Sequence, residues 1–414
     1  MGKLYIIGSG LAGLSASLWA SKKKLDMHIF ESTGMSGGRC RSFYDKKMEI
    51  EIDNGNHIVL SANNNFYEFC QIVESVNSLK KIPPIFNFFN LEEKLYWKLD
   101  LYQNGPSSII FNKEKGIPNS KVSDYYSLLN FLFVKKSAKV EDLINKHSTL
   151  YKNFWEPFTL GIMNTSPRHA SANVLSNVLK KTLFRGKDFF FVYQPIKNWN
   201  KTLIEPAIAY LKKRKKDIMY NHSLKGIEIK DNRICKLQFN RMDINVNKND
   251  KVILALPLNI FGKFFPSILI PSEFNTIINI HYKLSDQILK KFRSEIIGMI
   301  ESKSQWIFVK KGYISITISD ANKFEDIPND IIAKLVWKEV CEYLAETLKL
   351  PTFRVIKEKK ATYNQSPENN HLLRNINPLP KNLLIAGDWT QNKLPCTIEG
   401  SILSGKKAVE LLDF

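Results

Sequence analysis

Three glycines near the start of the chain have the spacing that holds a phosphate group. Gly8, Gly10 and Gly13 form a GxGxxG pattern. In such a pattern the first glycine permits a tight turn, the second lets the backbone approach a diphosphate, and the third lets a helix pack on the preceding strand. The first N–H groups of that helix and its dipole attract phosphate oxygens, so Leu11 and Ala12 are also expected to bind the cofactor.

The segments around these glycines have the order of a dinucleotide-binding βαβ unit. Residues 5–7 and 27–30 are short apolar runs typical of buried strands, and residues 14–20 predict a helix between them. Glu31 ends the second strand, 18 residues beyond Gly13, where a carboxylate accepts hydrogen bonds from an adenosine ribose. A lone glycine pattern is often only a turn, but the strands, helix and acid together predict a bound dinucleotide.

A second glycine-rich loop favours FAD over NAD. Residues 34–42 contain Gly38 followed by two arginines, Arg39 and Arg41. Such a loop brings backbone close to a diphosphate while the guanidinium groups neutralise it. A nicotinamide dehydrogenase has no usual need of this second phosphate cradle.

A turn after the next predicted strand is expected to face the same cofactor. The strand covers residues 48–52, and Asn54 and Gly55 follow it as candidate cofactor-binding residues. His57 lies in the same turn and is a candidate catalyst, although a histidine in this setting is more often solvated or structural.

The C-terminal part of the chain supplies a second half of the predicted site. A strand at residues 382–386 places Asp388 at its end, where the carboxylate could accept hydrogen bonds from ribityl hydroxyls. A helix predicted from Thr397 would direct its first N–H groups at the flavin N1/C2=O edge, where negative charge gathers on reduction. The candidate cofactor-binding residues here are Gly387, Asp388, Thr397, Ile398 and Glu399.

The composition indicates a globular protein of two lobes. The chain has 414 residues, of which 44% are hydrophobic. Its five cysteines are scattered without CxxC spacing, which favours a reducing cytoplasm and predicts neither a disulfide framework nor a metal site. We expect no signal peptide, because the first strand begins at once, and no membrane-spanning helix, because no apolar run is long enough.

A net charge of +20 leaves three interpretations open. One is compositional drift, since the chain is rich in Lys, Asn and Ile together. Another is attraction to an anionic membrane surface. The third is nucleic-acid binding, but the basic runs at residues 22–24 and 212–216 lie near predicted helix ends, where cations favour the dipole. No nucleic-acid motif accompanies them, so we expect no nucleic-acid partner.

The two ends of the chain resemble the FAD-dependent amine oxidase and phytoene desaturase superfamily. Within it, the chain is similar to the hydroxysqualene dehydroxylases, the squalene-associated flavoenzymes of hopanoid synthesis. The segments that carry this resemblance are residues 53–60, 154–158, 163–165, 169–172, 305–308, 361–367 and 386–400. The chain departs from the family at Asn56, where glutamine is common, and at Cys40 and Cys396, where alanine is common. No counterpart of a flavin-attaching cysteine is evident, so the resemblance implies non-covalent FAD.

The resemblance implies an α/β fold with a Rossmann-like, discontinuous FAD-binding lobe and an α+β substrate lobe, as in flavin amine oxidases. The FAD-binding lobe is predicted to take residues 1–62, 199–260 and 371–414. The substrate lobe is predicted to take a mostly helical part, residues 63–198, and a sheet part, residues 261–370. In the family, Leu224 would contact the adenine through its backbone.

The resemblance also implies an isoprenoid lipid as substrate. The expected location is the cytoplasm that the cysteines favour, and a peripheral contact with the inner face of the cytoplasmic membrane stays open. Hydroxysqualene would lose its allylic hydroxyl as reduced flavin gives hydride, and His57 and Tyr363 are the candidate proton donors. The electron donor stays open, because one GxGxxG unit leaves no second dinucleotide domain. It could be a transiently bound nicotinamide, another protein or a quinone.

Other functions share this architecture. They are a carotenoid or polyene desaturase, a flavin amine oxidase in which Trp389 would form one wall of an aromatic cage, and a non-catalytic FAD-binding partner in a lipid-synthesis complex. Three segments also stay ambiguous. An aromatic helix predicted at 125–136 is either core or in contact with a bilayer, residues 189–191 are either pocket or core, and residues 264–271 are either a tunnel mouth or a connector.

Overall fold

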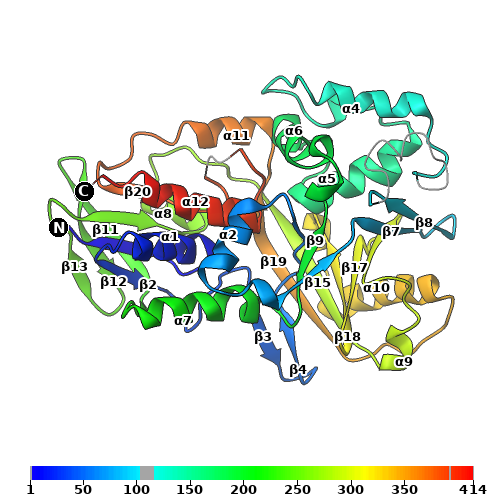
Figure 1. The fold of residues 1–414 in the computed structure, drawn as a ribbon, viewed down its shortest axis with the longest axis horizontal. Helices are drawn as coiled ribbons and strands as arrows, with labels where there is room; N and C mark the ends of the chain where they lie inside the picture. The colour runs from blue at the N-terminus through cyan, green and yellow to red at the C-terminus, as the bar shows by residue number, and fades with distance from the viewer. Residues whose placement is uncertain (1, 103–115, 391–392, 414) are drawn as a thin grey trace.

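A parallel sheet forms the centre of the first lobe. The computed structural model describes residues 2–102, 116–390 and 393–413 (Figure 1). The sheet has five strands in the order β10-β2-β1-β14-β20. Their bounds are β1 Leu4–Ile7, β2 Met27–Phe30, β10 Ile218–Met219, β14 Lys251–Leu254 and β20 Leu383–Ile385. Helices cover such a sheet on its faces, which explains why β1 is apolar throughout and buried at every position.

The first and last helices of the chain pack against each other on this sheet. Helix α1 spans Leu11–Lys22 and α12 spans Ile398–Glu410, and Figure 1 shows them side by side. A β-carbon on Gly405 would lie 2.1 Å from the backbone oxygen of Ala12, so only glycine permits this approach. Ser15 Oγ donates to the Ile402 carbonyl at 2.6 Å. The C-terminus therefore completes the lobe that the N-terminus begins.

Smaller elements surround the parallel sheet. Helices α2 (Asn64–Ile72) and α7 (Glu205–Lys213) pack near α12 and α1. An antiparallel sheet contains β11 Leu224–Lys230, β12 Arg233–Phe239 and β13 Asp243–Asn245, and α8 Leu258–Phe264 follows β14. A hairpin joins β3 Ser42–Asp45 to β4 Ile50–Asp53. A further small sheet contains β5 Val59–Leu60, β6 Leu79–Ile82 and β9 Val192–Pro195.

A seven-stranded sheet organises the second lobe, in the order β19-β15-β18-β17-β16-β7-β8. The bounds are β7 Ile85–Asn90, β8 Leu95–Asp100, β15 Phe274–Lys283, β16 Ile296–Ile300, β17 Trp306–Lys310, β18 Tyr313–Ile318 and β19 Phe353–Tyr363. Helix α10 (Asn329–Leu344) shares a buried core with one face of this sheet. The short helix α9 (Asp286–Leu289) lies between β15 and β16, and α11 (Pro367–Arg374) lies between β19 and β20 of the parallel sheet.

The sequence predicted residues 63–198 as mostly helical, and this is wrong for β6 to β9. In β7, Phe88 packs among the helices while Phe89 packs on the side of α10. This alternation is the two-residue period of a strand between two apolar layers. An aromatic run with apolar residues on both sides does not reveal that period clearly in the sequence.

The helical part of the second lobe contains α4 Ser127–Asn130, α5 Glu156–Met163 and α6 Ala172–Lys181. The prediction of a single aromatic helix at 125–136 is wrong. A 3₁₀ turn at Val122–Tyr126 precedes α4, and α4 itself is short. The chain then turns so that Phe131 stacks on Trp155, with ring centroids 4.9 Å apart. No helix in the described ranges is long and apolar enough to cross a lipid bilayer.

The two main sheets draw on different parts of the sequence. The parallel sheet takes strands from residues 1–62, 199–260 and 371–414, while the seven-stranded sheet takes strands from 63–198 and 261–370. The exact lobe boundaries stay a prediction.

Candidate functional site

The first glycine turn ends β1 and begins α1. Gly8 has φ of 105°, which favours glycine, and a β-carbon on Gly13 would lie 1.8 Å from the Gly8 carbonyl oxygen. Gly10 is the N-cap of α1, and because it has no side chain, no N-cap side chain accepts a hydrogen bond from the first turn. The first-turn N–H groups, which include those of Leu11 and Ala12, have no helical carbonyl partner. They are therefore free to bind an anion at the end of the strand.

Glu31 lies beside this turn. Its carboxylate accepts hydrogen bonds from the backbone N–H and the hydroxyl of Ser9, both at 2.9 Å, and from the backbone N–H of Thr33 at 2.9 Å. Burial raises the pKa of Glu31, but these hydrogen bonds outweigh it and hold the pKa below its usual value. Leu224 lies close by, because His222 donates its N–H to the Glu31 carbonyl at 2.8 Å.

The second glycine-rich loop folds onto the first. Gly37 donates its N–H to the Ser9 carbonyl at 2.9 Å and forms a parallel bridge with Gly10. Gly38, with φ of 57°, faces Gly10 so closely that a β-carbon on Gly38 would lie 3.3 Å from the Gly10 Cα. Arg41, in the same loop, has a buried Nε donor with no partner among the described residues. The two loops thus form one backbone-lined cradle.

Arg39 joins this cradle to the C-terminal strand. Its Nη2 donates to Asp388 Oδ1 at 2.7 Å, and a second guanidinium nitrogen donates to the Ala361 carbonyl. Burial alone would lower the pKa of Arg39, but the Asp388 carboxylate outweighs it and raises that pKa. Gly387 donates its N–H to Ser404 Oγ at 2.8 Å, which fixes the turn that presents Asp388.

The predicted helix near Thr397 is confirmed. Thr397 is the N-cap of α12, and its hydroxyl accepts the Gly400 N–H at 3.2 Å. Glu399, expected to face the cofactor, uses its side chain elsewhere. One carboxylate oxygen accepts from the Phe66 N–H at 2.9 Å and the other from the Asn65 side chain at 2.7 Å. The Glu399 carboxylate therefore caps α2. The groups that Ile398 and Glu399 offer to a cofactor are then their backbone N–H groups at the start of α12.

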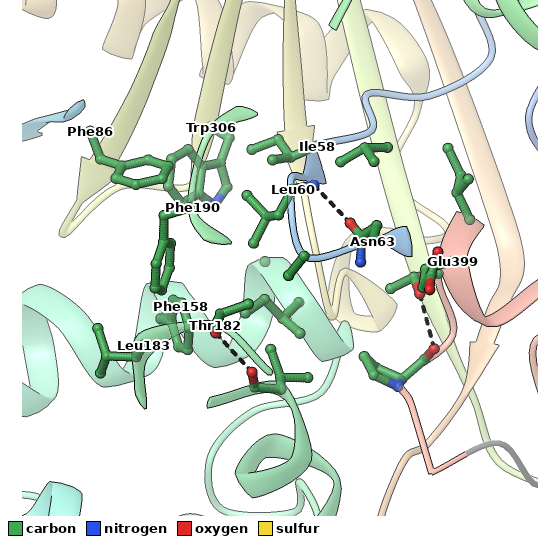
Figure 2. A pocket seen from close by; sticks show the side chains of 18 of the residues that line it. Ile58, Leu60, Asn63, Phe86, Phe158, Thr182, Leu183, Phe190, Trp306 and Glu399 are labelled. Atoms are coloured by element: carbon green, nitrogen blue, oxygen red, sulfur yellow. Dashed lines mark hydrogen bonds between the residues drawn. The ribbon is translucent and has the colours of Figure 1, made fainter. Parts of the chain in front are cut away.

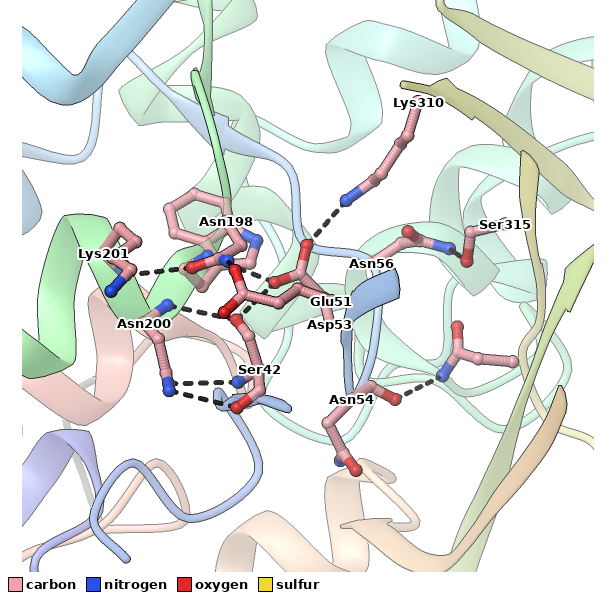
Figure 3. Close-up of polar contacts among 12 residues, drawn as sticks. Ser42, Glu51, Asp53, Asn54, Asn56, Asn198, Asn200, Lys201, Lys310 and Ser315 are labelled. Carbon is pink, nitrogen blue, oxygen red and sulfur yellow. Dashed lines mark hydrogen bonds and ion pairs between the residues drawn. The ribbon is translucent and has the colours of Figure 1, made fainter. Parts of the chain in front are cut away.

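Asp53 connects three segments at the base of the site (Figure 3). Its carboxylate accepts from Ser42 Oγ at 2.6 Å, from the Trp199 N–H at 3.1 Å and from Lys310 Nζ at 2.7 Å. Burial raises the pKa of Asp53, but Lys310 and these hydrogen bonds outweigh it and lower that pKa. The ion pair with Lys310 ties the hairpin of the first lobe to β17 of the second.

The turn after Asp53 lies between the two lobes. Asn54 donates its N–H to the Arg41 carbonyl at 2.8 Å, and a β-carbon on Gly55 would lie 3.3 Å from Asn279 Nδ2. The Asn56 amide nitrogen donates to Ser315 Oγ at 2.7 Å (Figure 3) and to Thr317 Oγ1 at 2.9 Å. This turn therefore connects the second glycine loop to the sheet of the second lobe.

An apolar cavity of about 230 Å³ opens above this turn. Figure 2 shows Phe86, Phe190 and Trp306 at one end and Asn63 and Glu399 at the other. Residues from β7, α5, β17 and the start of α12 line it together. Residues 189–191 were predicted to be either pocket or core, and Phe190 lines this cavity. Residues 264–271, predicted to be either a tunnel mouth or a connector, do not line it. The apolar walls suit a hydrocarbon chain, and the start of α12 forms one end.

His57 and Tyr363 do not line the cavity. The His57 ring lies edge-on to Trp199, with centroids 6.1 Å apart, and its Nε2 is buried without a partner among the described residues. Burial, aided by Lys310 and Arg39, lowers the pKa of His57 to about 4 in spite of Asp53. The imidazole is therefore neutral at neutral pH.

Tyr363 is the last residue of β19, and its hydroxyl donates to Asn370 Oδ1 at 2.9 Å. Burial, with Cys396 and Asp388 nearby, raises the pKa of Tyr363 well above its usual value. Trp389, considered for an aromatic cage, packs on Phe261 and donates to the Leu256 carbonyl at 2.9 Å, outside the cavity lining.

The geometry of Gly10 tests whether these residues fit FAD. Its backbone has φ of −67° and ψ of −180°, which any residue adopts. A β-carbon there would meet no described atom closer than the Gly38 Cα at 3.9 Å. Neither backbone strain nor protein packing therefore requires glycine at position 10, whereas Gly13 is required by packing. An open cradle beside a helix N-terminus and an unpaired Arg41 donor fits the diphosphate of FAD.

The comparisons agree with this geometry. A sequence profile described as flavin containing amine oxidoreductase matches residues 11–412. The chain belongs to this family. It is 31% identical to a hydroxysqualene dehydroxylase of Sinorhizobium fredii, covering 99% of this chain and 97% of the relative. It is 32% identical to the enzyme of that name in Zymomonas mobilis subsp. mobilis, covering 99% of both.

The fold agrees as well. Cyclohexylamine oxidase from Brevibacterium oxydans superposes with a TM-score of 0.71 at 11% identity, covering 99% of this chain and 98% of the oxidase. The predicted family resemblance and the flavin amine oxidase-like fold are confirmed. This member of the family is an FAD-dependent oxidoreductase.

Several residues of the site escaped the sequence analysis. Asp53 and Lys310 were not singled out, because their partnership spans 257 positions. Trp306 and Phe158 lie in segments that carry the family resemblance, and that was their only signal. In the described ranges, no group of three or more His, Cys, Asp or Glu side chains is arranged to hold a metal ion.

Proposed function

We propose that this chain reduces hydroxysqualene to squalene with FAD as its redox cofactor. The observation that carries the proposal is the apolar cavity that reaches the N-terminus of α12 and Asn56, which lies in the turn that contacts the second glycine loop. The names of the two relatives support the same substrate. A thirty-carbon hydrocarbon with one hydroxyl needs walls that are almost wholly apolar, as those at Phe158 and Phe190 are.

The residues that would hold FAD come from both ends of the chain. The α1 N-terminus and Gly10 would contact the diphosphate, Glu31 the ribose, and Asp388 the ribityl hydroxyls. The N–H groups at the start of α12 would stabilise negative charge at the flavin edge. When bound in its reduced form, FAD supplies a hydride.

The protein's remaining task is to let hydroxide leave. The allylic C–O bond breaks, a C–H bond forms at the same carbon, and the hydroxide takes a proton to become water. The cavity excludes water from the reacting carbon. We retain His57 and Tyr363 as proposed proton donors. His57 is the better placed of the two, because it follows Asn56, which lines the cavity, and because a neutral imidazole whose Nε2 is unpaired among the described residues would relay a proton to the hydroxyl.

The location and the electron donor belong to the same proposal. We place the enzyme in the cytoplasm, in peripheral contact with the inner face of the membrane that holds its substrate. An external nicotinamide, a protein or a quinone would reduce the flavin, since a single glycine-turn motif of the dinucleotide type occurs in the sequence.

The test uses purified FAD-loaded protein, reduced anaerobically with dithionite and mixed with hydroxysqualene. We expect squalene to form as the flavin reoxidises, and His57→Asn to slow this step while FAD stays bound. Flavin absorbance in a rapid-mixing instrument follows the reaction, and extraction identifies the lipid. Reoxidation that does not depend on hydroxysqualene would refute the proposal. Reduction of the oxidised flavin by a polyene or by an amine would instead identify a desaturase or an amine oxidase.

A further inference from the structure

A row of large apolar side chains lies in water on the outer edge of the second lobe. Tyr126 is 66% exposed, Leu129 59% and Phe133 91%. Together with Val122, at 48%, they recur every three or four residues along the turn Val122–Tyr126, α4 and the residues after it. Soluble proteins seldom expose apolar residues in such a contiguous group unless the surface binds something.

This exposure is built into the fold. Within the same stretch, Tyr125 is buried and shares a hydrogen bond of 2.9 Å with Ser120, and Phe131 is fully buried against Trp155. Ser176 Oγ of α6 donates to the Phe131 carbonyl at 2.6 Å. Two inward aromatic anchors therefore hold the outward side chains in place, so their exposure does not come from a frayed end.

Basic residues flank the apolar row. Lys121 precedes it, Lys135 and Lys136 follow it, and all three are exposed. None of the three makes an ion pair with another described residue. Unpaired lysines around an apolar centre complement a bilayer with anionic headgroups, because the apolar groups enter the interface while each cation is attracted by the surface charge.

The same surface adjoins the cavity through α6. Phe131 packs in one buried cluster with Leu175 and Leu179 of α6. The last residue of that helix, Lys181, lines the cavity and is exposed, and Thr182 and Leu183 line it next. Figure 1 shows α4 at the outer end of the lobe, beside α6. A membrane held at α4 would therefore lie one helix away from the cavity wall.

We propose that residues 121–136 form a docking surface for an anionic lipid bilayer. This surface, which we call the docking segment, places the cavity near the membrane that stores the lipid. The inference rests on the proposed function only for the identity of that lipid. Docking itself requires just the exposed apolar row, its anchors and the flanking lysines.

The experiment measures sedimentation of the full-length FAD-loaded protein with vesicles. The vesicles contain phosphatidylcholine alone or phosphatidylcholine mixed with phosphatidylglycerol. We expect the wild type to prefer the anionic vesicles by about tenfold or more. The double variant Leu129→Glu with Phe133→Glu should lose about tenfold or more of this affinity, since two charges replace two inserted side chains. Lys135→Glu with Lys136→Glu should abolish the preference for anionic lipid.

A matched control lies elsewhere on the surface, between α8 and β15. Leu269 is 73% exposed in the connection after α8, and Leu269→Glu should bind vesicles as the wild type does. Retained flavin absorbance shows that each variant is folded. Equal vesicle binding by the wild type and the docking-segment variants would overturn the proposal. So would failure of the wild type to bind anionic vesicles, which would leave the surface to a protein partner.

The two proposals fail separately. Turnover is measured with hydroxysqualene dispersed in detergent, where no bilayer is needed. Docking-segment variants should keep the wild-type rate there and lose it when the substrate is embedded in vesicles. Vesicle binding without turnover in detergent would refute the proposed function and support docking. Turnover in detergent by a protein that does not bind vesicles would support the proposed function and refute docking.

Discussion

Arg39 and Asp388 are 349 positions apart in the sequence, yet Arg39 Nη2 lies 2.7 Å from Asp388 Oδ1. The Asp388 side chain is 7% exposed and that of Arg39 38%. The pair joins the second glycine loop to the turn after β20, where both residues were predicted to meet the cofactor. It makes the geometry of one end of the chain depend on the other.

We expect Asp388→Asn to weaken FAD binding by about tenfold, because the amide neither neutralises Arg39 nor accepts as strongly from hydroxyl groups. Quenching of flavin fluorescence during titration of the apoprotein measures the affinity. Asp413, which pairs with Lys251 and is 94% exposed, gives the matched control Asp413→Asn, for which no change is expected. Equal loss in both variants would contradict a specific role for Asp388.

Alanine at Gly13 should reduce the stability of the fold, whereas alanine at Gly10 should reduce FAD affinity. At Gly13 a β-carbon would lie 1.8 Å from the Gly8 carbonyl oxygen, so Gly13→Ala should destabilise the fold itself. At Gly10 the nearest described atom would be 3.9 Å away, so Gly10→Ala should keep the melting temperature of the apoprotein and lose about tenfold or more in FAD affinity. A Gly10→Ala protein with unchanged FAD affinity would show that no cofactor approaches there.

Glu399 should matter chiefly for stability. Its carboxylate caps α2 through Asn65 and Phe66, so Glu399→Ala leaves buried N–H groups unpaired and should cost about 2 kcal/mol of unfolding free energy. Urea unfolding measures the loss. Glu346, in an exposed ion pair with Lys291, is the control, and Glu346→Ala should cost less than about 1 kcal/mol. A stable Glu399→Ala protein with lost FAD would instead favour direct contact with the cofactor.

His281 should make the protein sensitive to acid. Both ring nitrogens are buried without partners among the described residues. Burial, with Lys310 nearby, lowers its pKa from 6.5 to about 3 against the opposing effect of Asp53. The unfolded chain takes up this proton near pH 6.5 and the folded one only near pH 3, so the stabilising contribution is complete above pH 6.5 and falls as the pH drops between these values.

The variant His281→Phe should therefore flatten the fall of unfolding free energy below pH 6.5 by up to about 1.4 kcal/mol per pH unit. Urea titrations of wild type and variant across that range measure the slopes. Parallel slopes would mean that His281 does not titrate on unfolding.

The cavity can be filled from its wall. Gly161 lines it, and a β-carbon there would lie 3.2 Å from Trp306 Nε1. Gly161→Leu should therefore block the lipid chain and lower turnover of hydroxysqualene by about tenfold or more, with FAD affinity unchanged. Steady-state squalene formation and flavin titration together test this. Normal turnover in a folded Gly161→Leu protein would place the substrate elsewhere.

The amino-acid sequence by itself determined the local parts of the nucleotide site. The turn from β1 into α1, the acid after β2 and the helix that Thr397 begins depend on residues only a few positions apart. Glycine spacing, an N-cap hydroxyl and short apolar runs restrict the backbone over that range. These elements are therefore visible in the sequence without knowledge of their neighbours.

Only the tertiary structure decided how distant segments share the work. The Glu399 side chain turned to α2 because the N-terminus of that helix lies next to it, 333 positions away in sequence. Asp53 forms an ion pair with Lys310, and Phe88 and Phe89 pack on opposite sides of a sheet. In the docking segment, Phe131 went inside and Phe133 outside. Both are phenylalanines in one apolar stretch, and which one meets water depends on where α6 and Trp155 pack.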